Sequence, residues 1–218
     1  MATLTYTVTS IKKDSGCFVK RNDGKIVFLR IEQDQDPVNP RIDWDCNLVH
    51  LICWHRLYNL GDEHDFASIR ELNDELTSQR RDGNDFFSTP LFLLDHSGLS
   101  LSATAFSNKW DSSLVGVAYV FKNDLVKNDI ISADEDVWRK KALEVINEEL
   151  ETYNQYLEGD VYGYTEMEYS HGSWKESSSC WGFFGDNPEK NGMLDEIGGG
   201  RVLNIKNEKE LVKQYKEL

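Results

Sequence analysis

The residues best suited to hold a metal ion are two cysteines and two histidines between positions 46 and 55. Cys46, His50, Cys53 and His55 offer the sulfur and nitrogen ligands that zinc binds in a tetrahedron. A helix would gather most of these ligands on one face, whereas a strand would divide them between its two faces. The sequence has no Cys-x-x-Cys pair. We therefore favour buried thiols and hydrogen-bonded imidazoles over structural zinc, and predict no metal site and no cofactor.

A second group, Asp95-His96-Ser97-Gly98, contains the residue types of a hydrolase triad. A nucleophile needs its base within about 3 Å, and side chains adjacent in sequence rarely converge in that way. A turn at a strand end explains the same residues, so the sequence identifies no catalytic residue. Function often resides at strand ends. We therefore keep a candidate ligand-binding set: Asp95, His96, Ser97, Trp110 and Asp111.

Aromatic side chains are concentrated in two runs near the C-terminal end, Asp160–Tyr164 and Ser179–Gly185. Such rings stack bases in proteins that bind single-stranded nucleic acid, but those proteins also need a positive groove for the backbone. This part of the chain is acidic, so core packing is the better explanation. Gly163 and Gly182 would let bulky rings lie over bare backbone on the neighbouring strand.

All of the net negative charge lies in the middle of the chain. Gly61 to Cys180 holds 24 acidic and 10 basic residues, which equals the net charge of −14 for the whole sequence. A protein surface that displays this charge repels nucleic acid and attracts basic surfaces. An ordinary solvated helix face would also carry acids. Neither Lys nor Arg occurs from Val145 to Ser173. The candidate partner-binding acids are Glu144, Glu148, Glu149, Glu151 and Glu158.

Local patterns predict the elements that position these residues. Asp23-Gly24 between two apolar runs predicts a β-hairpin over 16–31, and Gln33–Asp45 has the composition of an exposed loop. Residues 46–58 fit either a strand or a helix, and β-branched residues favour the strand. Apolar residues at helical spacing predict an amphipathic helix over Phe66–Arg81. Leu91–Leu94, opened by Pro90, and Val115–Phe121 are predicted central strands.

The strongest helix signal covers about 132–158. Ser132 and Glu135 form a capping box, apolar residues follow every three or four positions, and Gly159 provides a stop. The aromatic runs on either side of His171 predict a second hairpin. After a flexible Gly198–Gly200 joint, we expect a strand over 201–205 and a short helix from Asn207 to Leu218.

This order of elements predicts an α+β fold with a mostly antiparallel sheet. The long helix over about 132–158 and one or two shorter helices would pack on that sheet. We expect one domain over residues 1–200 and a C-terminal strand and helix over 201–218 that pack on the same domain. An apolar stretch long enough to span a bilayer and a secretion signal are both missing from the sequence, so we expect a cytoplasmic protein without membrane contact.

Five motifs carry a resemblance to a known family. They are Cys53-Trp-His-x-x-Tyr-Asn-Leu-Gly-Asp62, Leu93-x-Asp-His-Ser-Gly98, Trp110-Asp-Ser-x-x-Val-Gly116, Tyr156-Leu-x-Gly-Asp-Val-Tyr-Gly-Tyr164 and Ser179-Cys-Trp-Gly-Phe183. From about Asp36 to Gly185 the chain resembles an uncharacterised family of small acidic proteins from phages and mobile elements of Gram-positive bacteria. The resemblance implies a setting in the cytoplasm of a host cell, where some accessory proteins act against defence systems by imitating the charge of nucleic acid.

Charge and resemblance together suggest a non-enzymatic accessory protein. It would bind and inhibit a host defence protein that has a basic surface, with nucleic-acid mimicry as one mode, and it would not bind nucleic acid directly. The alternative is a protein that binds a small molecule or nucleotide, to sequester or hydrolyse it, at a site around Asp95, His96, Trp110 and Asp111.

Overall fold

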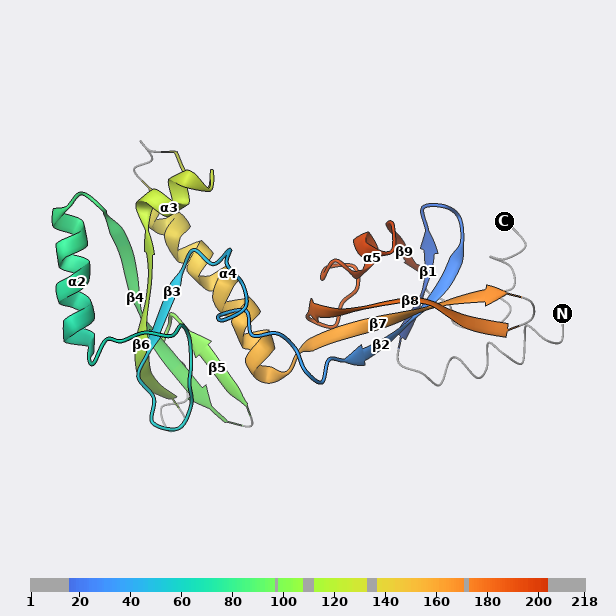
Figure 1. Cartoon of the computed structure of the whole chain (residues 1–218), viewed down its shortest axis with the longest axis horizontal. Coiled ribbons are helices and arrows are strands. Elements are labelled where there is room, and N and C mark those ends of the chain that lie inside the picture. Colours follow the sequence, from blue (N-terminus) through green and yellow to red (C-terminus); the bar gives the residue numbers. More distant parts are fainter. Residues whose placement is uncertain (1–15, 97, 108–111, 133–136, 171–172, 204–218) are drawn as a thin grey trace. The chain divides into compact units, whose positions relative to one another are not determined.

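The computed structural model describes residues 16–96, 98–107, 112–132, 137–170 and 173–203 (Figure 1). These residues form two compact units, each with its own sheet. Val38–Glu158 make up the central unit, and the described residues on either side of that segment make up the terminal unit. The sequence predicts a single domain over residues 1–200, whereas the described residues of this range fall into two compact units.

The central unit contains a four-stranded antiparallel sheet in the order β3-β6-β4-β5. Its strands are β3 (His50–Cys53), β4 (Phe86–Asp95), β5 (Leu99–Ser102) and β6 (Ser112–Phe121). Its helices are α2 (Ile69–Arg81), α3 (Lys122–Lys127) and α4 (Trp138–Glu158). Alternate residues of β6 pack on opposite sides, so Ala118 lies in the core with α4 and Tyr119 in the core with α2. The two longer helices therefore cover opposite faces of the sheet.

Local sequence explains how α2 begins and how α4 ends. In α2 the hydroxyl of the N-cap residue Ser68 accepts from the Glu71 amide, and the Glu71 carboxylate accepts from the amide of Ala67, one residue before the N-cap. This arrangement is a variant of the capping box. Helix α4 begins at Trp138, six residues after the predicted start at Ser132. Glu135, the second half of the predicted capping box, lies outside the described residues. Gly159, at a φ of 71°, ends α4 as predicted.

The terminal unit contains a five-stranded antiparallel sheet in the order β8-β7-β2-β1-β9. Its elements are β1 (Gly16–Arg21), β2 (Ile26–Gln33), β7 (Val161–Ser170), β8 (Ser173–Phe184), α5 (Met193–Glu196) and β9 (Gly200–Leu203). Both predicted hairpins are confirmed, and the second is longer than predicted. The predicted helix from Asn207 to Leu218 lies outside the described residues.

The two strand glycines singled out in the sequence have different roles. A Cβ atom at Gly163 would collide with the Trp181 ring, so this ring lies on bare backbone as predicted. A Cβ atom at Gly182 would meet nothing within 4 Å, and the φ of 88° there is the feature that favours glycine. The α+β class with antiparallel sheets is confirmed, and no helix of the described part of the chain is long and apolar enough to cross a membrane.

Candidate functional site

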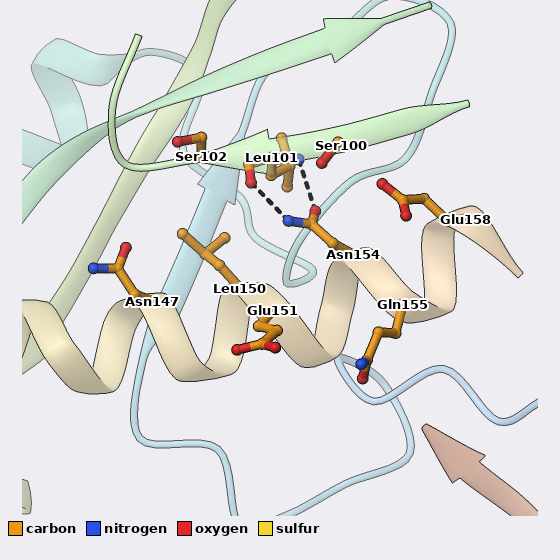
Figure 2. Close-up of a pocket in the computed structure, with 9 residues that line it drawn as sticks. All are labelled: Ser100, Leu101, Ser102, Asn147, Leu150, Glu151, Asn154, Gln155 and Glu158. Carbon is orange, nitrogen blue, oxygen red and sulfur yellow. Dashed lines mark hydrogen bonds between the residues drawn. The ribbon is translucent and has the colours of Figure 1, made fainter. Parts of the chain in front are cut away.

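A groove of about 370 Å³ lies between α4 and the strand β5 (Figure 2). Leu101 and Leu150 are its apolar residues. The remaining lining residues are Ser100, Ser102, Asn147, Glu151, Asn154, Gln155 and Glu158. They present hydroxyl, amide and carboxylate oxygens and no basic side chain, so the groove suits a partner that supplies cationic hydrogen-bond donors.

Asn154 attaches α4 to the edge of the sheet. Its side-chain oxygen accepts from the Leu101 amide at 2.7 Å, and its side-chain nitrogen donates to the Leu101 carbonyl at 2.8 Å (Figure 2). Because β5 is the last strand of the sheet, this amide occupies backbone groups that a further strand would use. The groove is therefore built on a fixed contact between helix and sheet.

The five predicted partner-binding acids fall into three groups. Glu144 pairs with Lys141 at 3.0 Å, and this hydrogen bond lowers the pKa of its carboxyl. Glu149 is half-buried and bonded inside the protein, which differs from the surface role expected for it. Glu148, Glu151 and Glu158 are exposed and have no ion pair among the described residues. These three carboxylates are available to a partner.

The charges of α4 run against the dipole of the helix. Arg139, Lys140 and Lys141 lie in its first turns, and Glu158 is its last residue. A helix is stabilised by acids near its N-terminus and by bases near its C-terminus, each by about 0.3–1 kcal/mol. Helix stability therefore does not explain this distribution.

Glu149 belongs to a buried network centred on Arg41, which we call the Arg41 clasp. The Arg41 side chain is 2% exposed, and it donates to Asp62 at 2.7 Å, to Glu149 at 2.6 Å and to the Val49 carbonyl at 2.5 Å. Glu149 also accepts from the Leu48 and Val49 amides, and Asp62 accepts from the Leu51 amide. The clasp ties the loop before β3 to α4. The predicted exposed loop over Gln33–Asp45 thus contains a buried arginine.

The four residues considered as zinc ligands are divided between the strand β3 and the loops on either side of it. His50 stacks on Tyr119 with ring centroids 4.6 Å apart, while Cys53 is buried and burial raises the pKa of its thiol to about 12. Cys46 lies exposed in the preceding loop, and the His55 ring stacks on Tyr58. Among the described residues, no three His, Cys, Asp or Glu side chains are arranged to hold a metal ion.

The predicted ligand-binding set is described only in part. The Tyr58 hydroxyl donates to the Asp95 carboxylate at 3.2 Å, and the His96 amide donates to the Gly98 carbonyl in a turn at the end of β4. Ser97, Trp110 and Asp111 lie outside the described residues, so the convergence of the set stays a prediction. Tyr58 also lines a hollow of about 750 Å³ together with Trp54, His55 and His64. This hollow was not predicted, because most of its lining lies in the loop after β3, where the sequence has no periodic pattern.

Buried Tyr119 is expected to make the central unit less stable at alkaline pH. Burial, followed by the charges of Asp62 and Glu75, raises its pKa to about 12, compared with about 10 in an unfolded chain. The unfolded chain thus releases this proton first. The contribution of protonated Tyr119 to the free energy of unfolding is intact below about pH 10. From there to about pH 12, about 1.4 kcal/mol of this free energy is lost per pH unit.

Urea denaturation of the protein and of Tyr119→Phe at pH 7 and at about pH 11 measures this effect. The variant keeps the ring but cannot ionise, so it should lose about 1 kcal/mol less between the two pH values. A residual loss is expected from Cys53, whose thiol pKa is raised in the same sense. Equal losses in protein and variant would contradict the role given to Tyr119.

Comparison of the chain with protein-family models, with curated proteins and with solved structures gives no match. The chemistry of the site is therefore the basis for the function proposed below.

Proposed function

We propose that this protein binds a basic protein partner along the exposed side of α4. The observation that carries the proposal is a set of three exposed carboxylates, Glu148, Glu151 and Glu158, that form no ion pair with the residues the structure describes. Two of them, Glu151 and Glu158, line the groove beside β5. In the setting that the resemblance implies, the protein is a non-enzymatic accessory protein of a phage or mobile element, and its partner is a host defence protein that it inhibits.

Electrostatics supports a protein partner over nucleic acid. The groove contains carboxylates without a basic side chain, and α4 has no Lys or Arg after Lys141. Phosphates would be repelled there, whereas Lys and Arg side chains would be attracted and steered. A basic surface that binds the phosphates of nucleic acid would also bind such carboxylates. The proposed mimicry is this replacement of phosphates by carboxylates.

The test compares two triple variants that remove the same charge. One is Glu148→Gln, Glu151→Gln and Glu158→Gln on α4; the matched control is Asp74→Asn, Glu75→Gln and Asp82→Asn at exposed positions of α2 and its end. Binding of a fluorescent Lys- and Arg-rich peptide is measured by anisotropy. Salt is varied from about 0.01 M to about 0.15 M, over which the Debye length falls from about 30 to about 8 Å.

We expect the α4 variant to bind the peptide at least about tenfold more weakly than the unchanged protein at low salt, a loss of about 1.4 kcal/mol. The α2 variant should lose less than about half of its affinity, since its carboxylates lie on the opposite face of the sheet. Equal weakening in both variants would mean that only net charge matters, and it would overturn the proposal. An affinity for the peptide that does not fall as the salt concentration rises would also overturn the proposal.

The small-molecule alternative rests on one contact. Tyr58 joins Asp95 to the aromatic hollow that also contains Trp54, His55 and His64. A concave, partly aromatic site with several polar groups is the usual setting for a small ligand. We propose it second, because two of its four named residues, Trp110 and Asp111, lie outside the described residues.

A further inference from the structure

A second hollow, of about 290 Å³, lies on the other side of the exposed ridge of α4, and we call it the Trp44 hollow. Its apolar residues come from the loop before β3, from the segment after α3 and from α4. They are Pro40, Trp44, Leu48, Ile130 and Val145. The other lining residues are Arg41, Cys46, Asn47, Glu148, Glu149 and Thr152. Arg41 and Glu149 are bonded to each other in the Arg41 clasp. The hollow is thus largely apolar, and Glu148 is its one carboxylate without an ion pair among the described residues.

The Trp44 hollow is continuous with the proposed binding surface. Residues 147 and 151 line the groove beside β5, and the next residues along the helix, 148 and 152, line the Trp44 hollow. One helical ridge therefore separates the two. A partner segment that meets Glu148 and Glu151 would lie directly over the Trp44 hollow.

The loop that forms the outer wall is held in place from within. The Arg41 clasp fixes its middle, and the Asn47 side chain donates to the Pro40 carbonyl at 2.7 Å and to the Trp44 carbonyl at 3.1 Å. A pocket that exists before binding requires little ordering of the protein when a partner arrives. The hollow therefore has the properties of a preformed anchor site.

We propose that the Trp44 hollow receives one large apolar side chain of the basic partner, next to a Lys or Arg that meets Glu148. This inference rests on the proposed function. The Trp44 hollow, at about 290 Å³, is at the lower limit of the volumes of small-ligand pockets, about 300–1,000 Å³. This volume suits a single side chain. A few buried anchor residues, enriched in Trp, Tyr and Arg, carry most of the binding energy in protein interfaces. The unpaired carboxylate of Glu148 complements a basic neighbour of the anchor.

The test uses two peptides of identical Lys and Arg content, one with a central Trp and one with Ala at that position. The unchanged protein should bind the Trp peptide about tenfold more tightly, or by about 1.4 kcal/mol. In Trp44→Ala this preference should fall below about twofold, while the affinity for the Ala peptide is unchanged. The matched control, Trp181→Ala, removes an exposed tryptophan of the terminal unit and should keep the full preference.

Cys46 provides a second readout that leaves the chain unchanged. It is an exposed thiol that lines the Trp44 hollow, whereas the other three cysteines are buried or half-buried. The Trp peptide should slow alkylation of Cys46 by N-ethylmaleimide, and prior alkylation should abolish the Trp preference. Equal affinities for the two peptides, or equal protection of Cys46 by them, would overturn the anchor and leave the proposed function standing. If neither peptide binds, the proposed function fails as well.

Discussion

Replacing Arg41 with alanine is expected to lower the free energy of unfolding of the central unit by about 3–5 kcal/mol. The substitution leaves the carboxylates of Asp62 and Glu149 facing each other without the buried guanidinium that they share. It also leaves the Val49 carbonyl without this donor. Removing one partner of a buried ion pair costs far more than the pair contributes, since an uncompensated charge stays behind. Amide hydrogen exchange in β3 and α4 measures the loss.

Two further variants separate the clasp from a general effect of losing an arginine. Arg56→Ala removes an exposed arginine of the same unit and should change stability by no more than about 0.5 kcal/mol. Adding Glu149→Gln to Arg41→Ala removes one of the two facing charges, so the double variant should be more stable than Arg41→Ala alone. If Arg41→Ala and Arg56→Ala behaved alike, the clasp would have no structural role.

Gly116→Ala is expected to destabilise the central unit by about 3 kcal/mol, at the upper end of the range for overpacked sites. A Cβ atom at Gly116 would collide with the Ile52 carbonyl oxygen and lie 3.0 Å from the Cys53 Cα atom. Both obstacles are backbone atoms of β3, which is paired to β6 at this point. These backbone atoms cannot move without breaking the hydrogen bonds between β3 and β6. Urea denaturation, followed by far-UV circular dichroism, measures the change.

Gly163→Ala is the matched comparison in the terminal unit. The obstacle there is the ring of Trp181, a side chain that is 48% exposed and can rotate away. We expect a loss below about 1 kcal/mol, the cost of an off-rotamer side chain. A loss as large as that of Gly116→Ala would show that the Trp181 ring is held as firmly as backbone.

Elements with a local cause could be predicted from the sequence. Asp23-Gly24 defines its hairpin without help from the rest of the chain, and Ser68 with Glu71 begins α2 through contacts within four residues. The acidic side of α4 was likewise visible in the sequence, because charge and helical spacing are both local properties. Glu151 and Glu158 were predicted as exposed acids, and both line the groove.

Features that depend on distant partners could not be predicted in this way. Arg41 and Glu149 are 108 positions apart, so neither residue type reveals that the two meet inside the protein. Arg41 was accordingly placed in an exposed loop and Glu149 among surface acids. The division into two compact units has the same origin. The 16–31 hairpin pairs with β7, more than 130 positions away, and no local pattern specifies that choice.

Asn154 has a consequence for the way α4 presents its charges. A helix that rests on a sheet through aliphatic side chains alone can roll by a fraction of a turn at little cost, since such contacts have no direction. Two hydrogen bonds between one side-chain amide and the backbone of one residue are directional, and they help to hold the helix at a single rotational setting. Glu151 lies three residues before Asn154 and Glu158 four residues after it. This uncharged side chain, together with the bonds of Glu149 in the Arg41 clasp, thus determines where both carboxylates point.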